Sequence, residues 1–435
     1  MTTALRPSAA LLALGEAPAA AGPGWQAFRQ AALARLTTLG LPTPRDDGFK
    51  YGNLRVLERR DLRPAAAAAV PAAPVDGSSS VGPGAHTVVI GPAGAVAADA
   101  AALARDGIEL VPLATLAATG TPESAGLVMP GDAPDERLCL WAAAMAGTGI
   151  VVRLADGARP RQPLHLIYLS GKGAQYPRLS LTLGVGARLT LVEEHRAPAD
   201  GKATTLAVSN LILAADAHLS HVRLDDAAPD LVLLDESRVE VGPRATYEQH
   251  SYGLRAGFSR LDLRVALTGA GAAAELTGLL MADAGRAAHV RTIVHHEAPD
   301  TRSSQTYRAI AGGGARASYD GKVIVAAGAR GAASRQSSRN LLLATDAEID
   351  TRPQLEIHTD DVTASHGATT GTLDTDMLFY LRSRGIDEAT ARGLLTYAFA
   401  ADVIRGVPLV PLRTLLGARI VGLLPDATLL RDFIA

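Results

Sequence analysis

RLSLTLGVGARLTLVEEH, residues 178–195, is the part of this 435-residue sequence that decides its fold class. Apolar residues alternate with polar ones on both sides of the small-residue turn GVGA. Leu179, Leu181 and Leu183 precede the turn, and Leu189 follows it. Because side chains on a strand point alternately to its two faces, a period of two predicts a pair of half-buried strands.

The same kind of turn recurs along the chain. Ala187, Ala217, Ala245 and Ala272 mark it at intervals of roughly 28 residues. Strands and small-residue corners that repeat at one period indicate a solenoid, in which each coil exposes apolar faces that its neighbours cover. The pattern predicts a parallel β-helix over residues 149–371, and a β-sandwich with glycine turns is the alternative.

Helical patterns flank this core, so the predicted fold class is mainly β with helical domains at both ends. Asp374 and Asp387 each precede an apolar helical pattern and are predicted N-caps. Few contacts are expected to cross the change from strand to helix periodicity after Gly371. The predicted domains are an N-terminal helical region (1–62), a flexible linker (63–85), a mixed α/β connecting region (86–148), the β-helix core (149–371) and a C-terminal helical domain (372–435).

Composition and charge exclude several function classes. The formal net charge is −2, so there is no basic excess to neutralise nucleic-acid phosphates. No apolar run approaches the roughly 18–20 residues of a membrane span. The apolar N-terminal run is short and interrupted by Glu16, which favours a cytoplasmic protein over a secreted one. Cys139 is the single cysteine, and its apolar helical context predicts a buried thiol.

Motifs of enzymes are absent or incomplete. GGGARA, residues 312–317, satisfies a dinucleotide-binding pattern, but a strand follows it where a helix would have to begin. DGKV, residues 320–323, resembles the end of a phosphate loop, but Arg316 stands where the loop needs its first glycine and Val323 where it needs serine or threonine. His295 and His296 precede Glu297, but adjacent strand residues face opposite sides, so a surface pair is predicted there rather than a metal site. We therefore expect no enzyme active site.

Three blocks within residues 319–400 carry a resemblance. They read YDGKVIV, SSRNLLLATDAEIDTRPQLEIHTDDVTASHGATTG and FYLRSRGIDEATARGLLTYAFA. In these blocks the chain resembles the SufB/SufD family of iron–sulfur cluster assembly proteins. GLPTPRDDGFKYGNL is similar to the family's N-terminal block, although Gly48, Phe49 and Gly52 depart from it. The resemblance implies that the solenoid is a right-handed β-helix.

Within the family the chain is similar to the SufD type, because its solenoid has no cysteine and contains SHGAT. The resemblance implies a non-catalytic subunit of a SufB–SufC–SufD complex, with a SufB-like scaffold and a SufC-like ABC ATPase as partners. It implies that His366 is a candidate metal ligand at the SufB interface. Ala364 stands where many relatives have cysteine, so thiolates would come from the partner. We expect no cofactor on the chain alone and a transient iron–sulfur cluster at that interface.

The resemblance also implies two groups of interface residues, one for SufB and one for SufC. The predicted partner contacts are Asp360, Asp361, Ser365 and His366 at the end of the solenoid, and Phe379, Tyr380, Arg382 and Arg384 in the C-terminal helices. Three other interpretations stay open. His366 could hydrogen-bond within a turn, the two aspartates could be turn acceptors, and Phe379 and Leu381 could pack on the chain's own solenoid.

Two further functions stay open at this level. A SufB-type scaffold acting as a homodimer would need cysteines near the end of the solenoid. An exported β-helix carbohydrate-active enzyme would line a groove with acids and aromatics, but aromatic residues make up 4% of the chain. Homodimerisation of the isolated chain through exposed solenoid edges is a third open question.

Overall fold

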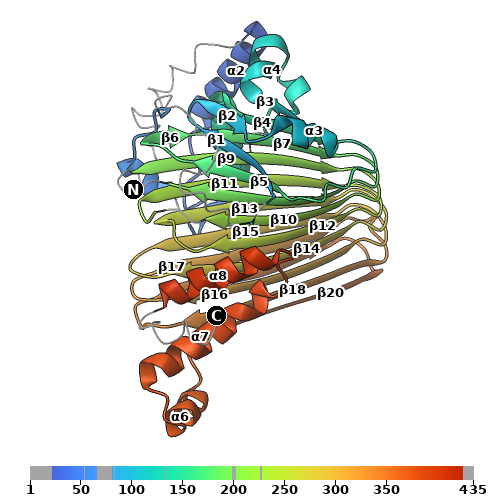
Figure 1. Ribbon diagram of the computed structural model, residues 1–435. Coiled ribbons are helices and arrows are strands. Elements are labelled where there is room, and N and C mark those ends of the chain that lie inside the picture. Colours follow the sequence, from blue (N-terminus) through green and yellow to red (C-terminus); the bar gives the residue numbers. More distant parts are fainter. Residues whose placement is uncertain are drawn as a thin grey trace.

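A computed structural model describes residues 22–52, 54–65, 81–82, 84–131, 133–197, 202–225 and 228–424 (Figure 1). The N-terminal segment with the apolar run, and most of the predicted linker, lie outside these residues. Within the described part, no helix is both long enough and apolar enough to cross a membrane.

Two facing sheets form the centre of the protein. Sheet 1 has the strand order β2-β1-β5-β8-β10-β12-β14-β16-β18-β20, and sheet 2 has the order β19-β17-β15-β13-β11-β9-β7-β4-β3, with β6 paired to β9. From β9 onward successive strands alternate between the sheets, and each pairs in parallel with the strand two earlier. This is the predicted β-solenoid, and a sandwich of antiparallel strands is ruled out.

The strands of sheet 1 are β1 (His86–Gly91), β2 (Gly94–Ala97), β5 (Leu164–Leu169), β8 (Arg188–Arg196), β10 (His218–Asp225), β12 (Thr246–Gly253), β14 (Ala273–Ala282), β16 (Arg302–Ala311), β18 (Ala332–Leu342) and β20 (Val362–Gly371). Those of sheet 2 are β3 (Ile108–Pro112), β4 (Thr148–Leu154), β6 (Gly173–Gln175), β7 (Pro177–Leu183), β9 (Ala203–Leu213), β11 (Leu231–Val241), β13 (Phe258–Leu267), β15 (Ala287–His296), β17 (Arg316–Val325) and β19 (Glu348–Ile357). Since β1 pairs with β5 in parallel, sheet 1 begins near residue 86.

The repeated alanines lie at the corners that lead into sheet 1. The backbone N–H groups of Ala187, Ala217 and Ala245 each donate to the carbonyl three residues earlier, at 3.1, 3.2 and 3.1 Å. All three alanines are buried, because each corner stacks on the corner of the preceding coil. At Gly242 a Cβ atom would lie 2.7 Å from the carbonyl oxygen of Leu213, so a side chain there would require the two stacked corners to shift apart.

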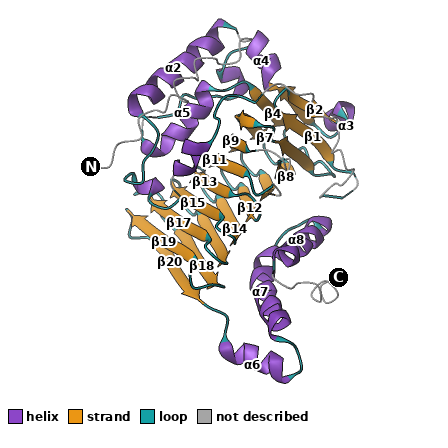
Figure 2. Cartoon of the chain, turned by 90° about the vertical axis from the view of Figure 1, so that its left-hand side faces the viewer, coloured by secondary structure: helices purple, strands orange, loops and turns teal. Residues whose placement is uncertain are grey.

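Helices cover the outer faces of both sheets (Figure 2). The helical elements are α2 (Pro23–Leu39), η2 (Asp47–Phe49), η3 (Leu54–Arg59), α3 (Ala100–Arg105), α4 (Leu113–Thr119), η4 (Glu123–Ala125), η5 (Pro134–Glu136), α5 (Arg137–Ala144), α6 (Thr375–Ser383), α7 (Glu388–Ile404) and α8 (Val410–Leu423). Trp25 of α2 and Trp141 of α5 join one apolar cluster with Val208 and Leu234 of sheet 2. The solenoid interior forms a separate apolar cluster between the two sheets.

The C-terminal helices α7 and α8 pack on the outer face of sheet 1. Val403 and Leu416 share an apolar cluster with Leu224, Tyr252 and Leu279 of that sheet. The Tyr252 hydroxyl also donates to the Val403 carbonyl at 3.1 Å. The expectation that few contacts cross the boundary after the solenoid is therefore wrong. Strands such as β10 are buried on both faces, and the outward Val222 and Leu224 of β10 are apolar, so the outer face also needs a cover.

Helix α6 differs from its neighbours because none of its residues is buried. It begins at the predicted N-cap Asp374, whose Oδ1 accepts from the N–H groups of Asp376 and Met377 at 2.8 and 3.0 Å. The predicted N-cap Asp387 of α7 is likewise confirmed by its bond from the Thr390 N–H at 3.0 Å. Figure 1 shows α6 extending away from the last coil of the solenoid.

Candidate functional site

The last coil, made by β19 and β20, is the open end of the solenoid. Among the strands that the structure describes, β20 pairs only with β18, and β19 only with β17. The outer edge of each strand thus presents backbone N–H and C=O groups without a neighbouring strand, which is the arrangement that accepts another chain. His366 lies in the middle of β20 and is exposed.

The position of His366 belongs to the interior face of the solenoid. Its register partner in β18 is Gln336, which is 2% exposed. Side chains of directly paired residues in a parallel sheet lie on the same face, so both belong to the inward row. His366 is exposed because no further coil in the described part of the chain covers this row. The alternative of a hydrogen-bonding turn residue is wrong, since His366 lies in a strand and its imidazole makes no hydrogen bond to the described residues.

The residues predicted to accompany His366 lie on the same coil. Asp360 and Asp361 are exposed in the turn between β19 and β20, and the Asp361 carbonyl accepts a backbone hydrogen bond from the preceding coil at 2.9 Å. Ser365 neighbours His366 but belongs to the outward row, opposite Arg335 of β18. The structure thus brings four of the predicted interface residues together at the open end.

The other four predicted contacts form a second group on α6. Phe379 is 74% exposed and Tyr380 is 56% exposed. Arg384 lies over the Tyr380 ring at 5.3 Å, and Arg382 approaches Glu388 at 3.5 Å. The interpretation that Phe379 packs on the chain's own solenoid is wrong, because its side chain is largely exposed to solvent. A solvent-facing aromatic pair flanked by arginines has the composition of an interface hot spot.

A row of polar side chains inside the solenoid leads to His366. This interior column consists of His221, Gln249, Gln305, Gln336 and His366, which occupy one register position in successive strands of sheet 1, apart from an apolar residue in β14. The first four are 0–2% exposed. Sequence reasoning missed the column, although each member is the fourth residue after a repeated corner position. Aligning the repeats on those corners would have revealed it.

The column carries unused hydrogen-bonding capacity. The Gln305 Oε1 accepts from Thr292 at 2.6 Å and from Tyr319 at 3.0 Å. Both side-chain amide atoms of Gln249 and of Gln336, by contrast, have no partner among the described residues. Since buried polar groups are almost always bonded to protein or water, we expect ordered water beside these two amides.

Deeper in the solenoid the column meets a buried charged cluster. One potential ligand atom from each of Glu193, His195 and Asp235 lies within 4.8 Å of the others. The Arg223 guanidinium makes a short ion pair with Asp235, and the His195 Nε2 lies 3.5 Å from the same carboxylate. The His221 Nε2 lies 3.6 Å from Glu193. All five side chains are nearly inaccessible to solvent.

Burial sets the protonation of this cluster. It raises the pKa of Glu193 to about 8 and lowers the pKa of His221 to about 3, and it also lowers the pKa of His195. Burial acts to raise the pKa of Asp235, but the adjacent Arg223 lowers it below its usual value. At neutral pH the ion pair is therefore the sole charged element of the five. A bound divalent cation would require Glu193 to ionise and would leave one uncompensated positive charge in the interior.

Two other sequence expectations concern single residues. Cys139 is 1% exposed, and burial raises the pKa of its thiol to about 12, which confirms the predicted buried thiol. The predicted surface pair of histidines is wrong for His296, which is inaccessible and bonded to Thr301 at 2.8 Å and Ser303 at 2.9 Å. His295 is half-buried, because adjacent residues of a strand face opposite sides.

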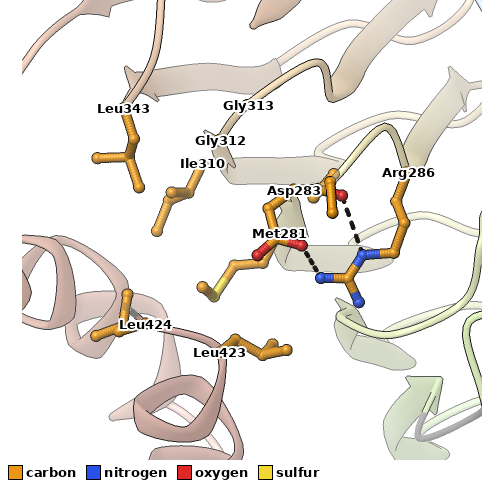
Figure 3. A pocket seen from close by; sticks show the side chains of 11 residues that line it. Met281, Asp283, Arg286, Ile310, Gly312, Gly313, Leu343, Leu423 and Leu424 are labelled. Atoms are coloured by element: carbon orange, nitrogen blue, oxygen red, sulfur yellow. Dashed lines mark hydrogen bonds and ion pairs between the residues drawn. The ribbon is translucent and has the colours of Figure 1, made fainter. Parts of the chain in front are cut away.

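An apolar cavity of about 300 Å³ lies between the end of α8 and two corners of the solenoid (Figure 3). Met281, Ile310 and Leu424 line it, and an ion pair between Arg286 and Asp283 stands at its margin. It shares no residue with the interior column or the open end. The cavity therefore lies at the packing interface between α8 and sheet 1 and is not part of the candidate site.

Comparison with known proteins agrees with these features. Residues 167–399 match the family model described as "SUF system FeS cluster assembly, SufBD core domain". The chain is 32% identical to the iron–sulfur cluster assembly protein SufD of Escherichia coli over 258 residues, or 58% of this chain and 61% of that relative. It is 30% identical to an iron–sulfur cluster assembly SufBD family protein of Mycobacterium bovis over 300 residues, or 67% of this chain and 75% of that relative.

A Synechocystis protein of the same description is 28% identical over 275 residues. The match to the Escherichia coli relative spans about three fifths of that protein's length. The family model covers more than half of the chain and most of the solenoid, which leaves the carbohydrate-active alternative without support. The chain belongs to the SufB/SufD family of iron–sulfur cluster assembly proteins and is a SufD-like member of it.

Proposed function

We propose that the protein is a non-catalytic subunit that pairs with a SufB-type scaffold through the open end of its solenoid and binds a SufC-type ATPase through α6. The three subunits together would assemble and deliver iron–sulfur clusters in the cytoplasm. The observation that carries the proposal is the exposed His366 on a strand with an open outer edge. A potential metal ligand and a strand edge that can accept another solenoid therefore lie at the same end of the protein.

The open end suits a partner of the same architecture. The free edges of β19 and β20 can add strands of a second solenoid by backbone hydrogen bonding. Ile357 at the end of β19 is 40% exposed, and Leu355 is partly buried against the interior cluster. A partner coil stacked here would cover both side chains and would enclose His366, which gives the pairing a hydrophobic contribution.

The ligand chemistry calls for a partner with thiols. A neutral imidazole is a competent iron ligand, but a single histidine does not hold a cluster. Cys139 is buried with a raised pKa, and Ala364 leaves the inward row beside His366 without a thiol. Thiolates would therefore come from the scaffold subunit. The cluster is cargo, held at the interface until it is transferred.

We expect His366→Ala to lower cluster formation in the three-subunit complex without changing subunit stoichiometry. The side chain is exposed and makes no hydrogen bond to the described residues, so its loss costs little stability. Retained iron should fall about tenfold or more, since removing even a group that only supports a metal ligand typically costs about 10–100-fold in affinity. Iron and acid-labile sulfide per purified complex measure the effect.

Three controls sharpen this test. His218→Ala removes a half-buried histidine in the middle of sheet 1, where it pairs with Glu248 at 3.4 Å, and should leave the yield unchanged. His366→Ala combined with Ala364→Cys offers a thiolate two residues away on the same face and should regain part of the yield. The chain without partners should retain no stoichiometric cluster. Equal yields from wild type and His366→Ala would contradict the proposal, and a cluster on the lone chain would favour the homodimeric scaffold.

We expect Phe379→Ala and Tyr380→Ala to weaken binding of a SufC-type ATPase. Both rings are more than half exposed on a helix without buried residues, so the thermal unfolding of the chain should not change. Truncating an aromatic hot spot costs about 2 kcal/mol or more, equivalent to a dissociation constant about 30-fold higher. Calorimetric titration with the ATPase measures the change. Val410→Ala, at a residue that is 61% exposed on α8, is the matched control, and equal affinity of all three variants would remove α6 from the docking surface.

A further inference from the structure

A polar pocket of about 270 Å³ lies on the outer face of sheet 1, beside α7. Its floor is formed by outward-facing residues of two neighbouring strands, β16 and β18. Ser304, Thr306 and Ser337 contribute hydroxyl groups to the lining. The pocket is separate from the interior column, because these side chains point away from the solenoid interior, and it belongs to neither group of predicted partner contacts.

The pocket carries an excess of positive charge. Arg308, Arg335 and Arg339 line it together with one carboxylate, Asp402, so the lining has a net charge of +2. Arg335 and Arg339 are exposed and make no ion pair or side-chain hydrogen bond with the described residues. Arg308 and Arg339 are direct register partners on adjacent strands. Like charges directly opposite each other destabilise a sheet unless something compensates them.

Arg308 is held in a defined position by α7. Its guanidinium donates to the Phe399 carbonyl at 2.6 Å, stacks over the Phe399 ring at 4.8 Å and forms a short ion pair with Asp402. The side chain is 9% exposed, yet its Nε has no partner among the described residues. Asp402 also approaches Arg405 at 3.8 Å, so its negative charge is compensated by other groups before any ligand binds.

We propose that this pocket binds a phosphoryl group, either as inorganic phosphate or as a phosphate monoester. A doubly charged phosphate matches the net charge of +2 and relieves the repulsion between Arg308 and Arg339. Guanidinium groups bind phosphate through paired N–H donors, and the three hydroxyls supply further donors around a tetrahedral anion. The volume exceeds that of a bare phosphate, which leaves room for a small organic portion.

The test is a calorimetric titration of the full chain with inorganic phosphate and, separately, with adenosine monophosphate at about 0.15 M salt, where diffuse surface charge is screened. We expect saturable binding at one site. Arg335→Gln and Arg339→Gln should each raise the dissociation constant about tenfold or more, because each removes charge-assisted hydrogen bonds. Both positions are exposed, so the variants should fold. If adenosine monophosphate binds more tightly than inorganic phosphate, the natural ligand is a phosphate monoester. If inorganic phosphate binds more tightly, the ligand is the free anion.

Arg302→Gln is the matched control. Arg302 is exposed at the start of β16 on the same outer face but does not line the pocket. Its loss changes the net charge equally and should leave binding unchanged. The proposal fails if neither probe binds saturably. It also fails if Arg302→Gln weakens binding as much as the two pocket variants do.

Discussion

A chain that ends after Asp387, and so lacks α7 and α8, is expected to lose its native fold or to aggregate. These helices bury eight large side chains on the outer face of sheet 1: Val192, Val222, Leu224, Tyr252, Leu279, Met281, Ile310 and Leu341. Each is worth about 1.5–3 kcal/mol when shielded from water. The free-energy cost of exposing several of them to water exceeds the net stability of about 5–15 kcal/mol that is typical of a folded protein. Size-exclusion chromatography and thermal unfolding measure the outcome.

The matched control keeps α7 and α8 but replaces residues 374–386 with a glycine–serine segment of the same length. This change removes α6, which has no buried residue, and retains the N-cap Asp387. It should leave a soluble chain with an unchanged melting temperature. A shortened chain that elutes as a monomer and melts like the wild type would show that sheet 1 does not need its helical cover.

Arg223→Met is expected to lower the free energy of unfolding by about 3–5 kcal/mol, because it leaves Asp235 charged and buried without its cation. The side chains of the pair are 4% and 1% exposed. The loss should be largest at neutral pH and smaller toward pH 4. Without Arg223 the folded-state pKa of Asp235 rises above its unfolded value, so protonation at low pH restores part of the stability. Urea unfolding at several pH values measures this effect.

Two further variants separate burial from pairing. Arg244→Met breaks the pair with Asp216 at 2.6 Å, whose side chains are 65% and 47% exposed, and should cost about 1 kcal/mol or less. Arg223→Met combined with Asp235→Leu removes both buried charges and should recover most of the lost stability. If Arg223→Met costs no more than Arg244→Met, the buried pair does not stabilise the interior in the way described.

The predictions from the sequence were most successful where the signal is local. Alternating leucines in residues 178–195 and the recurring corner alanines predicted a solenoid, since each coil repeats one strand-and-corner unit. The caps Asp374 and Asp387 were also readable, because a capping side chain bonds within its own first turn. The family resemblance rested on contiguous blocks and was confirmed by the match over residues 167–399.

Features that depend on neighbouring coils could not be read in this way. Successive coils differ in length, so residues about 30 positions apart become neighbours only when their register is known. That register decides that His366 continues the inward row of Gln336, and that Arg308 meets Arg339. It also decides which of two adjacent histidines is buried, and that residue is His296.

The sequence by itself determined the coil repeat, the helix caps and the family, because each is encoded in residues close together along the chain. The tertiary structure decided the rest. Stacking of coils turns a lone His366 into the end of a polar column at an open edge. Packing of α7 and α8 on sheet 1 leaves α6 exposed and places Asp402 beside Arg308. These arrangements follow from burying both faces of sheet 1, a requirement that acts between segments far apart in the chain.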